Sequence, residues 1–255
     1  MRYTRVVHHG RPRWARLEGG AQDGVAHLLS GSPVDGDPVD VATVPLDGLG
    51  RLPPVVPGVF YAVGLNYRAH LDRARELGLA GRPEVGYRAS NALVGDGAAI
   101  RVPPDLTGQL EAEGELVAVI GAPLRRASRE QARAAVFGWT IGNDVSARDW
   151  QRTDSSLLRA KNSDTFKPMG PWIETDVDPM AQTTTVRVNG VPAASFATGD
   201  MIFDPWEHLV EASRYVTFHP GDVLWLGTGA ACPITAGDVV EVEITGIGTL
   251  TNPVE

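Results

Sequence analysis

The sequence predicts an α+β fold in which antiparallel strands dominate and helices are few. Short runs of alternating apolar and polar residues, such as residues 239–245, have the two-residue period of half-buried strands. Helical composition with a clear start signal is found in only a few short stretches. At 255 residues with 43% hydrophobic content, the chain is long enough to bury a large core and to carry a small additional unit.

The first 55 residues form the predicted small unit. Short apolar bursts alternate there with turns rich in Gly, Asp and Pro, which is typical of a β-rich domain. The segment 50–58 contains three prolines and suits an extended connector. Residues 56–255 are therefore predicted to form a second, larger domain.

Three helices are predicted within the larger domain. Ser128 and Gln131 have the spacing of a capping box in front of a run rich in alanine. Asp204 is a favourable N-cap residue, followed by a first-turn proline and a capping-box glutamate. Asn66 opens a third predicted helix, which ends near Gly78.

Charge and composition exclude several classes of protein. The net charge is −8 and no stripe of Lys and Arg is present, which argues against a nucleic-acid partner. The single cysteine, Cys232, allows no intrachain disulfide and suits a reducing compartment. No signal-peptide core or membrane-length apolar run is visible. These features predict a cytoplasmic enzyme with no membrane partner.

A run of alternating carboxylates is the strongest chemical signal. Glu111, Glu113 and Glu115 alternate with small residues, so that on one strand all three would project from the same face. Neighbouring anions repel unless a cation lies between them. Oxygen ligands favour Mg²⁺, Mn²⁺ or Ca²⁺ over zinc. The alternative interpretation is a solvated strand edge whose charges prevent aggregation.

Ordered motifs on both sides of this run resemble the fumarylacetoacetate hydrolase (FAH) family. They extend from Phe60 to Val254, about three quarters of the chain. The principal motifs are Gly64-Leu65-Asn66-Tyr67-Arg68-Ala69-His70, Gly142-Asn143-Asp144-Val145-Ser146-Ala147-Arg148-Asp149-Trp150-Gln151, Ala160-Lys161, Asp164-Thr165-Phe166-Lys167-Pro168-Met169-Gly170-Pro171 and Pro220-Gly221-Asp222.

The resemblance implies a fold, a metal site and a class of substrate. The implied core is the family's mixed β-sandwich roll. The implied ligands of a Mg²⁺ or Mn²⁺ ion, with Ca²⁺ also possible, are Glu113, Glu115 and Asp144. Glu111 falls where relatives often have an acidic residue that does not bind the metal. The implied partners are a small anionic 2-oxo acid and a second copy of the chain in a homodimer.

Further roles follow from the same resemblance. Lys161 and Arg148 match residues that contact the substrate or stabilise negative charge. Gln151 and Thr228 match substrate-binding positions, and Tyr67 is predicted to line the pocket. By their residue types alone, Arg148 could equally form a structural ion pair with Asp149 or another acid, and Lys161 would be a surface lysine.

His70 is assigned as an acid/base, but its surroundings depart from the family pattern. Relatives that hydrolyse or decarboxylate their substrates often have His-x-x-Glu, in which the glutamate orients the imidazole. Here Arg73 stands in the place of that glutamate, which weakens a water-activating role. The alternative interpretation is a solvent-facing helical histidine. The other histidines are interpreted as structural or exposed: His8, His9, His27, His208 and His219.

Two further departures surround the metal ligands. Relatives commonly have Thr-Gly-Thr-Pro-x-Gly where this chain has Gly229 after Thr228, and a Phe-x-Lys segment where it has Tyr87-Arg88. Substrate specificity is therefore expected to diverge while the metal site is retained.

The family's defining reaction is the first functional prediction. It is hydrolytic cleavage of a C–C bond in a small 2-oxo or 1,3-dioxo carboxylate through a metal-bound enolate. The missing His-x-x-Glu pair makes isomerisation, hydration or decarboxylation of a related acid the alternatives. A catalytically lapsed scaffold that binds a metal or metabolite is the third hypothesis.

Overall fold

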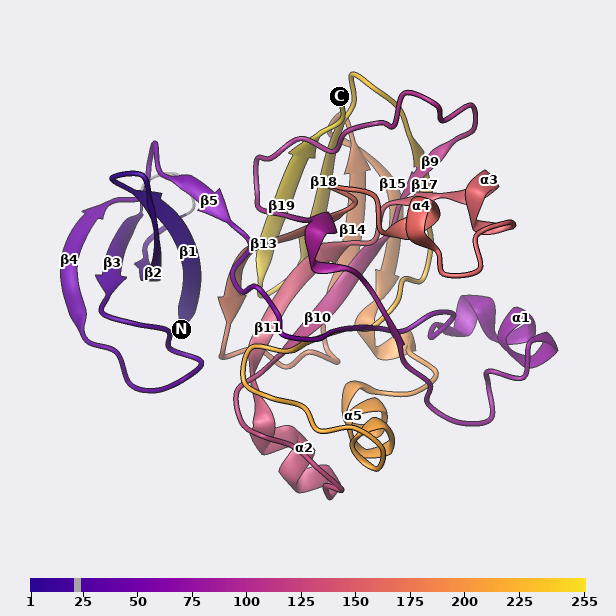
Figure 1. Ribbon diagram of the computed structural model, residues 1–255, viewed down its shortest axis with the longest axis horizontal. Helices are drawn as coiled ribbons and strands as arrows, with labels where there is room; N and C mark the ends of the chain where they lie inside the picture. Colours follow the sequence, from indigo (N-terminus) through magenta and orange to yellow (C-terminus); the bar gives the residue numbers. More distant parts are fainter. Residues whose placement is uncertain (21–23) are drawn as a thin grey trace.

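The computed structural model describes residues 1–20 and 24–255, and its described part is built mainly from strands (Figure 1). A twelve-stranded sheet has the order β4-β3-β2-β1-β13-β11-β10-β16-β6-β7, with β5 paired to β1 and β8 to β13. A four-stranded sheet, β15-β14-β18-β19, and a three-stranded sheet, β12-β9-β17, complete the described strands. Most pairs are antiparallel and the helices are short, so the predicted α+β class is confirmed.

The N-terminal strands extend the large sheet. They are β1 (Arg2–His8), β2 (Arg11–Glu18), β3 (Val25–Leu29), β4 (Asp40–Pro45) and β5 (Gly50–Leu52). Strand β1 joins them to β13 (Lys167–Glu174), where Tyr3 pairs with Ile173. Trp172 of β13 packs into the same apolar cluster as Val6 and Leu28. The strand-rich character of residues 1–55 is therefore as expected, and the domain boundary at residue 55 stays a prediction.

The main core lies between the large sheet and the four-stranded sheet. The strands of the large sheet here are β10 (Gly114–Ile120), β11 (Val136–Asn143) and β16 (Val223–Trp225), with β6 (Phe60–Ala62), β7 (Gly86–Tyr87) and β8 (Leu93–Val94) at its margins. The facing sheet contains β14 (Thr183–Val188), β15 (Val191–Ala197), β18 (Val239–Ile244) and β19 (Gly248–Pro253). Leu116, Val186 and Val242 belong to one buried cluster that joins the two layers.

Gly114 lies directly against the four-stranded sheet. A Cβ at this position would lie 2.8 Å from Val242 Cγ1 and 2.9 Å from Val186 Cγ2, closer than packed atoms tolerate. Glycine is therefore needed between Glu113 and Glu115, and the facing sheet fixes the backbone that carries both carboxylates.

The carboxylate run is not one continuous strand, contrary to the prediction. Glu111 lies in β9 (Leu110–Ala112), which pairs with β12 (Ser146–Ala147) and β17 (Cys232–Ile234). Glu115 lies in β10 of the large sheet, and Glu113 lies at the break. There the Glu113 backbone N–H donates to the Asn143 side chain (3.0 Å), and its carbonyl accepts from the Asp144 N–H (2.9 Å). These two bonds replace regular strand pairing.

Two of the three predicted helices have the predicted caps. Helix α2 (Arg129–Ala135) begins with a complete capping box between Ser128 and Gln131. Helix α5 (Pro205–Ser213) begins in the same way with Asp204 and Glu207. Two single-turn helices, α3 (Arg148–Gln151) and α4 (Leu158–Lys161), carry site residues. Among the described residues, no helix is both long and apolar enough to cross a membrane.

The Ser128 cap offers a test of the local fold. We expect Ser128→Ala to lower the free energy of unfolding by about 1 kcal/mol, because an N-cap hydroxyl satisfies an otherwise free helical N–H. Urea denaturation would measure the loss, and Ser128→Asp, which keeps a capping acceptor, is the control. Equal stability of the alanine variant and the parent protein would contradict this role.

The third predicted helix begins later than expected. A turn of 3₁₀ helix (Arg68–His70) precedes α1 (Leu71–Glu76), and Gly78 lies just beyond its end with φ +71°. Asn66 does not cap this helix. Its buried amide donates to the carbonyls of Phe203 and Leu226, both at 3.1 Å, and so joins distant loops.

Candidate active site

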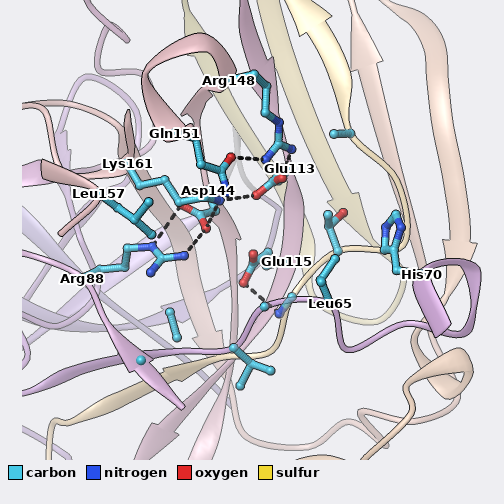
Figure 2. A pocket seen from close by; sticks show the side chains of 17 residues that line it. Leu65, His70, Arg88, Glu113, Glu115, Asp144, Arg148, Gln151, Leu157 and Lys161 are labelled. Atoms are coloured by element: carbon cyan, nitrogen blue, oxygen red, sulfur yellow. Dashed lines mark hydrogen bonds and ion pairs between the residues drawn. The ribbon is translucent and has the colours of Figure 1, made fainter. Parts of the chain in front are cut away.

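A cavity of about 410 Å³ is lined by most of the side chains with predicted roles (Figure 2). It lies where the break before β10 meets the end of β11, the β6–β7 pair and helices α3 and α4. Every predicted site residue except Tyr67 lines this cavity: His70, Glu113, Glu115, Asp144, Arg148, Gln151, Lys161 and Thr228.

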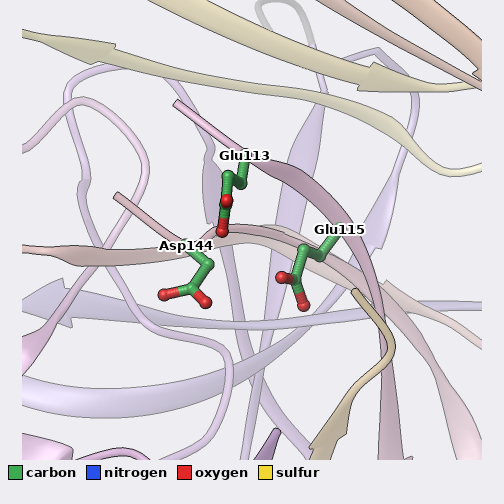
Figure 3. A group of neighbouring side chains, drawn as sticks. All are labelled: Glu113, Glu115 and Asp144. Carbon is green, nitrogen blue, oxygen red and sulfur yellow. The ribbon is translucent and has the colours of Figure 1, made fainter. Parts of the chain in front are cut away.

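Three buried carboxylates stand together at the cavity wall (Figure 3). Glu113, Glu115 and Asp144 each offer one oxygen, and these oxygens lie within 4.8 Å of one another. Burial raises the pKa of Glu115 well above its usual range, and the charges of Asp144 and Glu113 raise it further. A divalent cation bound by oxygen ligands would remove this repulsion, so the donor set fits the predicted metal site. Glu111 is not part of the group.

Lys161 lies inside this group and not on the surface. Its ammonium is 2.7 Å from Glu113 Oε2 and 2.8 Å from Asp144 Oδ2, and the side chain is almost fully buried. Burial opposes the charge of Lys161, but the two carboxylates still raise its pKa above the ordinary value. The interpretation of Lys161 as a surface lysine is therefore wrong.

Two cations that the sequence analysis gave no role also hold Asp144. Arg88 Nη2 lies 2.9 Å from Asp144 Oδ2, and Lys167 Nζ lies 2.7 Å from Oδ1. Burial alone would raise the pKa of Asp144, yet Arg88, Lys161 and Lys167 hold it well below its usual range. Burial lowers the pKa of Lys167 to about 8 against the opposing effect of Asp144.

A sequence signal for Lys167 was present. It is the one charge in the otherwise apolar run 166–173, and a charge in such a run requires a partner inside the protein. Arg88 gave no such signal, because its partner lies 56 residues away in the chain.

Arg148 forms ion pairs with Glu111 and Glu113. It also donates from Nη1 to Gln151 Oε1 at 2.9 Å. Arg148 thus pairs with acids other than Asp149 while lining the cavity, so its structural and binding interpretations are compatible. Glu111 anchors Arg148 from outside the group of three carboxylates.

His70 is half-buried at the cavity wall, at the end of the 3₁₀ turn. Within residues 1–20 and 24–255, no hydrogen bond or ion pair that orients its ring is seen. Arg73 pairs with Glu76 at 2.9 Å, and both side chains are exposed. The described part of the chain therefore supplies no substitute for the orienting glutamate.

Tyr67 is not at the cavity wall, contrary to the prediction. Its ring is buried against Phe196 in an edge-to-face contact with centroids 5.0 Å apart. Burial raises the pKa of Tyr67 above its usual range, and its hydroxyl has no partner among the described residues. Tyr67 belongs to the main buried cluster together with Met201, with which its backbone forms an isolated bridge.

Packing also explains the glycine at position 229, where the loop departs from the family pattern. A Cβ at Gly229 would lie 2.6 Å from the Phe196 ring, so this position admits only glycine. Gly227, with φ +81°, donates its N–H to Glu115 Oε2 at 2.9 Å. Thr228 lines the cavity between them, and its hydroxyl donates to the Ala230 carbonyl at 2.7 Å.

This fold and this group of carboxylates agree with the comparisons to known proteins. The family model described as "Fumarylacetoacetate (FAA) hydrolase C-terminal" matches residues 59–255, and "Rv2993c-like, N-terminal" matches residues 1–54. The chain belongs to the fumarylacetoacetate hydrolase family of enzymes.

Its similar relatives include named isomerases. The crystal structure of 2-hydroxyhepta-2,4-diene-1,7-dioate isomerase from Mycobacterium marinum is 37% identical, with a TM-score of 0.90 and coverage of 100% of this chain and 98% of that one. That of 5-carboxymethyl-2-hydroxymuconate delta-isomerase from Mycobacterium smegmatis is 35% identical, with a TM-score of 0.89 and coverage of 100% and 99%. Oxaloacetate tautomerase YisK from Bacillus subtilis is 34% identical over 204 residues, 75% of this chain and 68% of that protein.

Proposed function

We propose that this chain is a divalent-metal-dependent isomerase that moves a proton within a small 2-oxo acid. Two of its similar solved structures are named isomerases, and a similar curated relative is named an oxaloacetate tautomerase. These names favour the isomerase alternative over the hydrolytic cleavage that the sequence analysis placed first. The observation that carries the proposal is the His70 ring, which faces the carboxylate cavity without an orienting acid.

The charges of the cavity suit an anionic substrate. When bound at Glu113, Glu115 and Asp144, a Mg²⁺ or Mn²⁺ ion would supply Lewis-acid stabilisation of a developing enolate. Arg88, Arg148 and Lys161 add positive charge at the same wall. Because these cations are held by buried carboxylates, they are preorganised and need not move as charge develops on the substrate.

His70 would carry the proton. In isomerisation a proton leaves one carbon or oxygen of the substrate and returns to another, so that no water is consumed and no C–C bond breaks. Imidazole can give or take a proton near neutral pH. Hydrolysis also requires a held and activated water, for which relatives use an oriented His–Glu pair. Proton transfer within the substrate needs no such water, and the substrate itself can hold the imidazole ring by a hydrogen bond.

The assay follows the enol form of oxaloacetate by its ultraviolet absorbance in the presence of Mn²⁺. We expect the enzyme to accelerate conversion to the keto form, and EDTA to remove this effect. If the enol decays at the uncatalysed rate with Mn²⁺ present, while a dienoate or acylpyruvate is cleaved, the isomerase proposal fails.

A substitution tests the role of His70. We expect His70→Gln to lower kcat about 100-fold, because a positioned acid/base contributes at least that factor. Mn²⁺ affinity, measured by calorimetry, should stay unchanged because His70 is not in the carboxylate group. His219→Gln is the control, since His219 does not line the cavity. Full turnover by His70→Gln would remove His70 from the mechanism.

A further inference from the structure

A second cavity, of about 290 Å³, lies next to the candidate active site. The two cavities share part of their walls, formed by Val63, Gly64, Leu65 and Gly86. The rest of the second cavity comes from Asn66, from residues 79–85, from Phe203 just before α5 and from His208 within it. A molecule held there would therefore touch residues that also line the candidate active site.

His208 of α5 is the unusual side chain of this second cavity. It lines the cavity, it is almost fully buried, and neither ring nitrogen has a hydrogen-bond partner among the described residues. Its ring meets Phe203 edge-to-face with centroids 6.0 Å apart. Buried polar groups are seldom left unpaired, because a buried donor or acceptor without a hydrogen bond destabilises the fold. His208 thus offers unused hydrogen-bonding capacity beside an apolar space.

The side chains that line the second cavity favour a neutral ligand. Leu79, Val85 and Phe203 are apolar, and Arg82 and Glu84 are exposed and lie 3.7 Å apart as an ion pair. Burial lowers the pKa of His208 to about 4 against the opposing effect of Asp204, so the ring is neutral near pH 7. A neutral imidazole has one donor and one acceptor nitrogen. The cavity therefore lacks the buried cations that hold anions at the first site.

We propose that the second cavity binds a small neutral molecule with an apolar body and one hydroxyl group, such as a phenol, through a hydrogen bond to His208. The ring nitrogens are shielded from solvent, so the ring must turn toward the ligand. Because the ring makes no hydrogen bond, this turn breaks none.

Leu65 lies on the wall that the two cavities share and has φ +55°, a left-handed conformation that costs free energy for a residue with a side chain. A ligand in the second cavity would therefore pack against a residue that also bounds the candidate active site.

The test is a titration of the full chain with phenol, observed through the imidazole resonances of His208 by NMR. Oxalate and Mg²⁺ are present to occupy the first cavity. We expect saturable shifts at His208, about three- to tenfold weaker binding of toluene, which lacks the hydroxyl, and no saturable binding of benzoate. Absence of saturable phenol binding under these conditions, or equal affinity for toluene, would overturn the proposal.

Two variants test whether phenol binds in the second cavity. Leu79→Trp is expected to fill the second cavity and abolish phenol binding, since Leu79 is a half-buried wall residue. Leu77→Trp is the matched control, because Leu77 is 50% exposed and does not line the cavity. Unchanged binding by Leu79→Trp contradicts the site. The readout is binding and not turnover, so its failure is distinguishable from failure of the isomerase proposal.

Discussion

Glu115→Gln is expected to weaken Mn²⁺ binding by more than about 100-fold and at the same time to stabilise the metal-free protein. Changes in outer-shell partners of metal ligands already cost 10- to 100-fold in affinity, and loss of a direct carboxylate ligand should cost more. Glu115 is buried beside Glu113 and Asp144, and its one hydrogen bond among the described residues comes from the Gly227 N–H.

The two effects have one electrostatic cause. Glutamine keeps an oxygen for the Gly227 N–H but cannot ionise, so it avoids the cost that burial and the charges of Asp144 and Glu113 place on ionised Glu115. Without the metal this change relieves repulsion, and with the metal it removes a ligand. Calorimetry with Mn²⁺ and thermal unfolding in EDTA measure the two effects separately.

Glu111→Gln is the control for this experiment. Glu111 pairs with Arg148 and lies outside the carboxylate group, so its substitution should leave Mn²⁺ affinity within a few-fold of the parent value. Tight Mn²⁺ binding by Glu115→Gln, or a loss in Glu111→Gln as large as in Glu115→Gln, would show that the metal assignment is wrong.

Lys161→Met should lower turnover about 1,000-fold without weakening Mn²⁺ binding. The Lys161 ammonium lies 2.7 Å from Glu113 and 2.8 Å from Asp144 at the cavity wall. Removal of one preorganised group that stabilises developing negative charge typically costs 10²- to 10³-fold. Loss of a positive charge beside two metal ligands makes the site more attractive to a cation. Turnover should therefore fall while Mn²⁺ affinity does not.

The neighbouring Arg159 provides the matched control for Lys161. Arg159 also lies in α4, but its side chain is 49% exposed and binds Asp154. Arg159→Met should therefore retain turnover. If Lys161→Met loses turnover and Mn²⁺ binding in proportion, Lys161 serves only to hold the metal ligands, and its assigned role in charge stabilisation fails.

Local signals in the sequence were sufficient for some elements. The capping boxes at Ser128 and Asp204 were predicted because all the participating groups lie within four consecutive residues. The strand break at Glu113 was not predictable in this way. It depends on a hydrogen bond that Glu113 donates to Asn143 and one that it accepts from Asp144, and both form only after the chain has folded.

The site residues also divide into those that sequence motifs predict and those whose contacts form only in the folded chain. Glu113, Glu115 and Asp144 were predicted as a group from the family motifs, and the structure brings their oxygens together. The cations Arg88 and Lys167 were given no role, because their contact with Asp144 is a consequence of tertiary packing. Tyr67 was misplaced for a related reason: a motif gives the residue but not whether its side chain faces the cavity or the core.

The most direct test of the isomerase proposal is the mass of the product formed in D₂O. The Mn²⁺-loaded enzyme would be incubated with a 2-hydroxy-dienoate or with oxaloacetate, and the products analysed by mass spectrometry. We expect an isomer of the substrate that differs from it in mass only by deuterium taken up at carbon, formed faster than in the same Mn²⁺ solution without enzyme. Release of CO₂, or formation of pyruvate together with a second carboxylic acid, would contradict isomerisation.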